Sequence, residues 1–155
     1  ALVNHGYAVL ALNYPGSTGR GWAFESRFHN SDIVECLQAL YPFFKKRGYN
    51  VIVPWSISSG VSVLEQWVRS RLPISAAVSQ ASALNLSQRL ELREQFELRN
   101  IPYFSARGLF DRHPGQDADY LYRGGHDITD PAQFTELITK VSKFLDKSRS
   151  LPILE

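Results

Sequence analysis

Short apolar runs alternate along the chain with longer segments in which apolar residues recur every three or four positions. Each short run has the length and the flanking turn formers that are typical of a buried strand. The pattern predicts five strands, at residues 7–12, 51–53, 74–78, 101–106 and 118–122. The first of them is apolar throughout and ends at the turn formers Asn13, Pro15 and Gly16.

The segments with helical periodicity predict four helices, at residues 33–46, 59–71, 87–99 and from Thr129 or Asp130 to about 147. Asp32 is placed to cap the first of these helices, and Pro42 inside it predicts a kink or an early end. Pro131 suits the first position of the last helix, where no backbone N–H is needed.

Strands that alternate with helices predict an α/β fold, with a mostly parallel sheet of about five strands and helices on both faces. Residues 1–149 are expected to form one such domain, and residues 150–155 a tail that a cloning vector could have supplied. The abrupt start inside an apparent domain, together with the absence of Met, favours a truncated chain. A truncated sheet would expose an edge strand, which favours association with another chain or with a missing N-terminal segment.

One predicted connection is too short. Six residues separate Asp111 from the last predicted strand at Ala118. A parallel crossover needs about a dozen residues or more. Either the last strand is not parallel to its predecessor or residues are missing between His113 and Asp117, and we favour the second explanation.

Composition narrows the function classes without choosing among them. The chain has 155 residues, of which 44% are hydrophobic and 21% charged, as in ordinary globular domains. A net charge of +2 with no long basic run gives no reason to expect nucleic acid as a partner. There is no apolar stretch of the roughly 18 residues that a membrane span needs, so we expect no membrane partner. The single cysteine, Cys36, excludes an intrachain disulfide and favours the cytoplasm.

Three polar residues follow predicted strands within five positions, in the order Ser58, Asp111 and His126. The carboxyl ends of parallel strands meet at one edge of a sheet, so these side chains are expected to lie close together. Serine, acid and then histidine is the chain order of α/β-hydrolases. The sequence therefore predicts a catalytic triad in which His126 is the base and Asp111 orients it. The decisive observation is whether the three side chains form one hydrogen-bonded line.

The serine motif fits a nucleophile elbow imperfectly. With Ser58 as nucleophile, the motif has its downstream glycine, Gly60, but Ser56 replaces the upstream one. Ser56 as an alternative nucleophile would have neither glycine, so the pattern favours Ser58. The backbone N–H of Ser59 is then the candidate oxyanion donor. A simpler interpretation is that Ser58 or Ser59 only caps the following helix.

Other chemistry is poorly supported. His126 lies between Gly125 and Asp127 after a strand, whereas the remaining histidines lack such a context. A metal site built from His113, His126 and the nearby aspartates has no recognisable ligand spacing, so no metal or other cofactor is expected. The glycine-rich loop at residues 13–21 lacks the Gly-Lys-Ser/Thr ending of a phosphate-binding loop.

Several segments resemble the catalytic domain of the prolyl oligopeptidase family of serine peptidases. Residues 6–21, which read GYAVLALNYPGSTGRG, are similar to a stretch that this family often carries. Residues 32–37 resemble the family's next helix, and residues 76–79, Asp111 and residues 125–126 follow in family order. The resemblance spans roughly residues 1–147 and implies a peptide or acyl-peptide substrate.

The sequence departs from this family in three places. The family's elbow usually reads Gly-Gly-Ser-x-Gly-Gly, its helix between the acid and the histidine has no counterpart here, and its His-Gly-Gly-Pro-like oxyanion segment would precede Ala1. These departures motivate an alternative function, in which the fold is kept, catalysis is lost and the chain binds a peptide or a partner chain.

Overall fold

The computed structural model describes residues 2–26, 29–112 and 117–149. Within these ranges, four strands form a single parallel sheet: β1 (Trp55–Ile57), β2 (Ala77–Gln80), β3 (Tyr103–Gly108) and β4 (Tyr120–Tyr122). Each strand pairs with the one before it, so the order across the sheet is β1-β2-β3-β4. The tail predicted at residues 150–155 lies outside the described residues.

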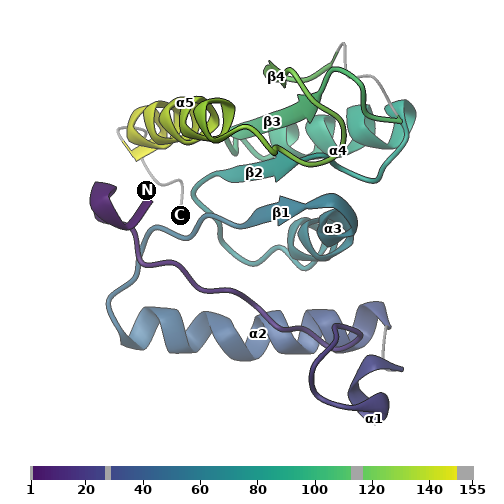
Figure 1. Ribbon diagram of the computed structural model, residues 1–155. Helices are drawn as coiled ribbons and strands as arrows, with labels where there is room; N and C mark the ends of the chain where they lie inside the picture. Colours follow the sequence, from purple (N-terminus) through teal and green to yellow (C-terminus); the bar gives the residue numbers. More distant parts are fainter. Residues whose placement is uncertain (1, 27–28, 113–116, 150–155) are drawn as a thin grey trace.

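Helices connect and cover these strands (Figure 1). The main helices are α2 (Asn30–Lys46), α3 (Val61–Arg69), α4 (Leu86–Leu98) and α5 (Pro131–Arg149). Shorter elements are α1 (Trp22–Glu25) and the 3-10 helices η1 (Leu2–His5) and η2 (Ser58–Gly60). Helix α3 connects β1 to β2 and helix α4 connects β2 to β3, which is the βαβ arrangement that the alternating pattern predicts.

Adjacent residues of β2 show that both faces of the sheet are covered. Ala77 packs with apolar side chains of α3 and α4, whereas Val78 packs with apolar side chains of α5. Neighbouring residues of a strand point to opposite faces, so α3 and α4 lie on one face and α5 on the other. The predicted α/β architecture with helices on both faces is therefore confirmed.

Helix α2 packs against α3 rather than against the middle of the sheet (Figure 1). Its buried side chains Ile33 and Leu37 meet Trp67 of α3. The helix runs through Pro42 to Lys46, so the predicted early end is wrong. Proline deprives the carbonyl four residues earlier of its helical partner. That residue is Gln38, which is exposed, so water can satisfy its carbonyl.

The first predicted strand is not a strand. Residues 7–12 have no assigned secondary structure, and Val9 and Leu10 are 64% and 57% exposed. The backbone of this segment pairs with none of the four strands. Only its ends are anchored, because Tyr7 packs on the α5 side of the sheet and Leu12 packs with the buried side chains of α2. An apolar run indicates burial, but a strand also needs a neighbouring strand to pair with.

The remaining strands begin later than predicted, and β1 shows one reason. The run at residues 51–53 precedes β1, and Pro54 separates the two. Proline has no N–H to donate to a sheet ladder. The carbonyls of Ile52 and Pro54 still accept hydrogen bonds, at 2.9 Å from the N–H of Ser75 and 3.0 Å from that of Val78. The predicted run thus leads into the strand.

Strands β3 and β4 are parallel, with Ala106 opposite Tyr120, so a non-parallel last strand is excluded. The predicted gap between His113 and Asp117 falls largely on residues 113–116, which lie outside the described residues.

The four predicted helices correspond closely to α2, α3, α4 and α5. Pro131 begins α5, and Asp130 Oδ1 accepts a hydrogen bond from the Ala132 N–H, as expected for a cap. The proposed cap Asp32 instead lies in the first turn of α2, after the N-cap residue His29.

Candidate active site

Ser58 occupies a sharp turn between β1 and α3. Its φ of 55° lies in the left-handed region, which a residue with a side chain enters at a cost of about 1–2 kcal/mol. The turn is closed by η2, and the Ala83 N–H donates a 3.3 Å hydrogen bond to the Ser58 carbonyl. A serine held in a strained strand-to-helix turn is the local geometry of a nucleophile elbow.

The turn also excludes the capping interpretation. The N-cap residues of η2 and α3 are Ile57 and Gly60, and neither helix start has a side-chain capping bond. The Ser58 hydroxyl is directed elsewhere, because its Oγ lies 2.7 Å from Nε2 of His126.

His126 is presented by a loop that follows β4. The loop is anchored by Tyr122, whose buried hydroxyl donates a 2.9 Å hydrogen bond to the His126 carbonyl. The His126 side chain is 44% exposed, and its two ring nitrogens contact different residues. Nε2 meets Ser58 Oγ, and Nδ1 lies 3.4 Å from each carboxylate oxygen of Asp111.

Asp111 lies in the turn that follows β3. Its carboxylate is only 6% exposed, and Oδ1 accepts a 2.7 Å hydrogen bond from the Arg112 N–H. Its other oxygen, Oδ2, is buried and has no hydrogen-bond donor in the part of the chain that the structure describes. The structure therefore brings Ser58, His126 and Asp111 into one line, from the ends of three different strands.

A close approach of two loops fixes this line. A Cβ atom at Gly108, the last residue of β3, would lie 1.9 Å from the Gly125 carbonyl oxygen and 2.6 Å from that of Gly124. The backbone of the acid loop also hydrogen-bonds to the histidine loop, from the Phe110 N–H to the Gly124 carbonyl at 2.9 Å. Only glycine at position 108 allows these two loops to lie so close together.

The two other serines of the motif lie elsewhere. Ser56 is within β1 and 7% exposed, and its Oγ has no hydrogen-bond partner among the described residues. The structure does not bring this alternative nucleophile to His126. Ser59 follows Ser58 in η2, where its carbonyl accepts a 2.5 Å bond from Ser62 Oγ. The role of the Ser59 N–H as oxyanion donor stays a prediction.

The three residues open onto a pocket of about 460 Å³. The pocket is lined by Ser58, Ser82, Ala83, Asp111, Arg112 and His126. Ser82 and Ala83 belong to the turn after β2, so the ends of all four strands contribute to the site or its walls. This volume falls within the usual range for small-molecule sites.

Sequence patterns did not point to two buried groups beside the triad. Arg107 of β3 is 2% exposed, and its Nη1 lies 3.8 Å from Asp111 Oδ2. Burial raises the pKa of Tyr122 to about 12, and the negative charge of Asp111 contributes further. Arg107 directly follows the run predicted as a strand at residues 101–106, and a cation at the end of a buried strand is a signal that a buried counter-charge lies nearby.

A polar network holds the chain beyond the acid loop against α4. Arg89 makes two hydrogen bonds to Asp117, at 2.8 and 2.7 Å, and its own side chain is 6% exposed. These bonds hold the pKa of Asp117 below its usual value. Arg93 pairs in the same way with Asp119, which precedes β4. The network fixes the start of β4, the strand that leads into the His126 loop.

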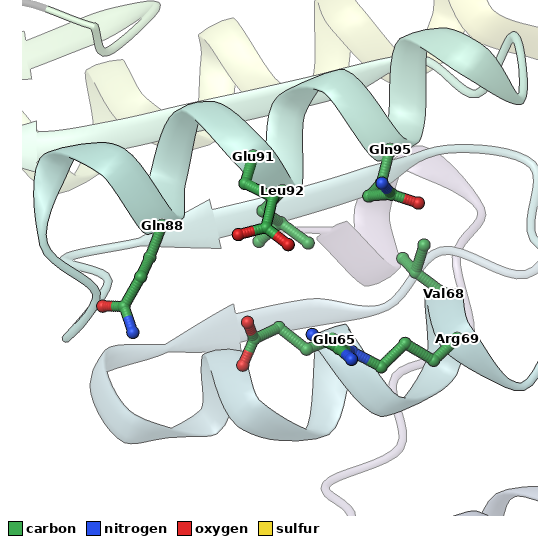
Figure 2. Close-up of a pocket in the computed structure, with 7 residues that line it drawn as sticks. All are labelled: Glu65, Val68, Arg69, Gln88, Glu91, Leu92 and Gln95. Carbon is green, nitrogen blue, oxygen red and sulfur yellow. The ribbon is translucent and has the colours of Figure 1, made fainter.

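A second pocket, of about 130 Å³, lies between α3 and α4 and shares no residue with the first (Figure 2). Figure 2 shows Glu65 and Arg69 of α3 facing Glu91 of α4. Burial raises the pKa of Glu65 above its ordinary value. The positive charge of Arg69 lowers this pKa in part, and the negative charge of Glu91 raises it further. None of the groups that form the proposed triad is close enough to line this pocket.

Three other sequence features concern a metal, a phosphate and a membrane. Across the described residues, no three His, Cys, Asp or Glu side chains come together as a metal would require, while His113 lies outside them. In the glycine-rich loop, the Gly19 N–H donates to the carboxylate of Glu25 at 3.2 Å, a partner that would repel phosphate. Among the described helices, none has the length and hydrophobicity to cross a membrane.

Comparison of the chain with protein-family models, with curated proteins and with solved structures gives no match. The function of this protein is therefore inferred from the geometry of the site itself.

Proposed function

We propose that this protein is a serine hydrolase that cleaves acyl compounds through Ser58, His126 and Asp111. The observation that carries the proposal is the pair of contacts made by His126, with Nε2 at 2.7 Å from Ser58 Oγ and Nδ1 at 3.4 Å from the Asp111 carboxylate. A histidine between a serine hydroxyl and a buried carboxylate is the arrangement that activates a serine.

In the proposed reaction, Nε2 of His126 accepts the Ser58 proton as Oγ attacks the acyl carbon. The carboxylate of Asp111 accepts a hydrogen bond from Nδ1–H and stabilises the imidazolium that forms. The imidazolium then protonates the leaving group as its bond to the acyl carbon breaks. In the second half, Nε2 of His126 takes a proton from water as the water oxygen attacks the acyl carbon, and the imidazolium returns that proton to Ser58 Oγ as the acyl–serine bond breaks. The Ser59 N–H is the donor proposed for the developing oxyanion.

The fold supports an α/β-hydrolase as the more specific class. The nucleophile follows β1, the acid follows β3 and the histidine follows β4, in a parallel sheet with helices on both faces. Chain order, strand positions and the left-handed Ser58 agree with that class. Within it, the resemblance of residues 6–21 favours the prolyl oligopeptidase family, and hence a peptide or acyl-peptide substrate.

An activity-based probe tests the proposal directly. A fluorophosphonate reacts with an activated serine but not with an ordinary one. We expect wild type and the S56A variant to be labelled, and S58A and H126A to remain unlabelled. Mass spectrometry of the peptide that contains residues 56–58 identifies the labelled oxygen. A folded wild-type protein that takes up no label, or a label on Ser56, would refute the assignment.

One observation favours a second candidate function, binding without catalysis. The 3.4 Å separation between His126 and Asp111 is longer than the 2.7–2.9 Å that is typical of charge-assisted hydrogen bonds. If the acid does not tighten onto the histidine, the 460 Å³ pocket still offers a peptide-binding surface. This function predicts peptide binding that survives in S58A and H126A, with no turnover by wild type.

A further inference from the structure

Arg107 connects two of the loops that form the candidate site. Its side chain leaves β3 four residues before Asp111 and is 3% exposed. One guanidinium nitrogen, Nη2, donates a 2.6 Å hydrogen bond to the carbonyl of Ser82, in the turn after β2. The other, Nη1, lies 3.8 Å from Asp111 Oδ2. A single cation thus spans the pocket wall and the acid.

The carboxylate of Asp111 needs this cation. Oδ1 has the Arg112 N–H and faces Nδ1 of His126, but Oδ2 has no hydrogen-bond donor in the described part of the chain. Without a cation nearby, a carboxylate that is only 6% exposed would tend to turn toward water. Among the described residues, the guanidinium of Arg107 is the permanent cation that lies within 4 Å of Oδ2.

Other charged groups surround the pair, and they do not replace Arg107. Arg89 is committed to Asp117 through two hydrogen bonds, so these two charges largely cancel each other. Tyr122 packs beside Asp111 but donates its hydroxyl to the His126 carbonyl. Burial and the positive charge of Arg89 lower the pKa of Arg107. The negative charges of Asp111 and Asp117 partly offset this lowering.

We propose that Arg107 is a positioning residue for the triad, whose buried guanidinium keeps the Asp111 carboxylate turned toward His126. The inference depends on the proposed function for its effect on catalysis, because Arg107 does not line the pocket and would act through Asp111. Its effect on the Asp111–His126 pair is independent of whether the protein is a catalyst. The two consequences can therefore be measured separately.

The first experiment follows the imidazole by NMR in protein labelled with ¹⁵N-histidine. In wild type, we expect a downfield Nδ1–H resonance from His126, as a hydrogen bond to a carboxylate produces. R107Q should lose this resonance and R107K should retain it, because lysine preserves the charge. His5 and His29, neither of which lines the pocket, serve as internal references. An unchanged resonance in R107Q, or a simultaneous change at His5 and His29, would overturn the proposal.

A second measurement leaves Arg107 in place. In the isosteric D111N variant, the guanidinium ¹⁵N–¹H signals of Arg107 should shift and exchange faster with water, whereas S58A should leave them unchanged. Signals that respond equally to D111N and S58A, or to neither, would show that Arg107 does not interact specifically with the acid.

The third measurement links the inference to catalysis. Fluorophosphonate labelling of Ser58 should slow by about 10-fold to 100-fold in R107Q, since a misplacement near 1 Å can cost about that much. R107K should restore most of the rate. Equal labelling of R107Q and wild type at every pH would overturn the inference and leave the proposed function intact. An unlabelled wild type with the expected NMR changes would refute the proposed function and leave the positioning role intact.

Discussion

The last residue of β3, Gly108, lies directly against the carbonyl of Gly125, with no room between them for a side chain. Through this contact, the loop that carries Asp111 and the loop that carries His126 set each other's position. The contact predicts which glycine of the site can be replaced and which cannot.

We expect Gly108→Ala to destabilise the protein by about 1–3 kcal/mol, the usual range for a side chain forced into a filled space. It should also reduce labelling of Ser58, because relief of the clash requires the histidine loop to move. Gly125→Ala is the matched control, since a Cβ there meets nothing within 4 Å. Urea unfolding and probe labelling measure both effects. Equal losses in the two variants would contradict this explanation.

The strained backbone of Ser58 predicts that a substitution which relieves the strain raises stability while it removes activity. Glycine enters the left-handed region without the steric cost that serine has at φ 55°. Ser58→Gly should therefore stabilise the fold, by up to about 1 kcal/mol, while it abolishes labelling. Ser58→Ala should abolish labelling without the gain in stability. Thermal unfolding of the two variants compares them, and a less stable S58G would show that the turn is not strained.

Tyr122 predicts a loss of stability at alkaline pH. Its pKa is raised to about 12, so the folded state keeps the phenolic proton at pH values where the unfolded chain has lost it. This contribution to stability is fully present below about pH 10 and is lost as the pH rises through about 12. Tyr120, with a pKa also near 12, contributes in the same window. The free energy of unfolding measured between pH 9 and 12 should fall less steeply in Y122F than in wild type, and an identical slope would contradict the assignment.

The ion pair between Arg89 and Asp117 should contribute far more to the free energy of unfolding than an ion pair on the surface does. Asp117→Asn leaves a 6% exposed guanidinium without its counter-charge, which typically costs about 3–5 kcal/mol. Glu136→Gln, which removes a pair to Lys140 between half-exposed side chains, should cost less than about 1 kcal/mol. The pKa of Asp117 is lowered, so its contribution is present above about pH 4 and is lost as the pH falls through the folded pKa. Urea unfolding at pH 7 and pH 3 should show the difference between the two variants shrinking at the lower pH.

The order of strands and helices could be predicted from periodicity, but the exact extent of each strand could not. The predicted strand at residues 74–78 corresponds to β2, which reaches Gln80. Ser79 and Gln80 are 2% and 7% exposed although they are polar. A sheet buries such residues when a neighbour satisfies them, as Tyr103 does for the Ser79 hydroxyl at 2.6 Å. Hydropathy along the chain contains no information about that neighbour.

In the candidate site, too, some residues could be predicted from the sequence and others could not. Ser58, Asp111 and His126 could be selected from the sequence because each follows a strand, and parallel strands end at one edge. The role proposed for Arg107 could not, because it depends on a carbonyl of the β2 turn that lies 25 positions earlier in the chain. The sequence predicts a strand at residues 7–12 because the hydrophobicity of this run is visible in it. Whether a neighbouring strand is available for pairing cannot be seen in the sequence.

The consecutive order of the four strands has a consequence for how the protein is made. Each strand can dock on its predecessor as it leaves the ribosome, so the sheet can grow from β1 toward β4 during synthesis. Ser58 then emerges and turns long before its histidine, which lies 68 positions later, is available. A nascent chain that is stalled before β4 should therefore be inert toward the probe. Labelling of Ser58 would then mark the moment at which the last strand is added.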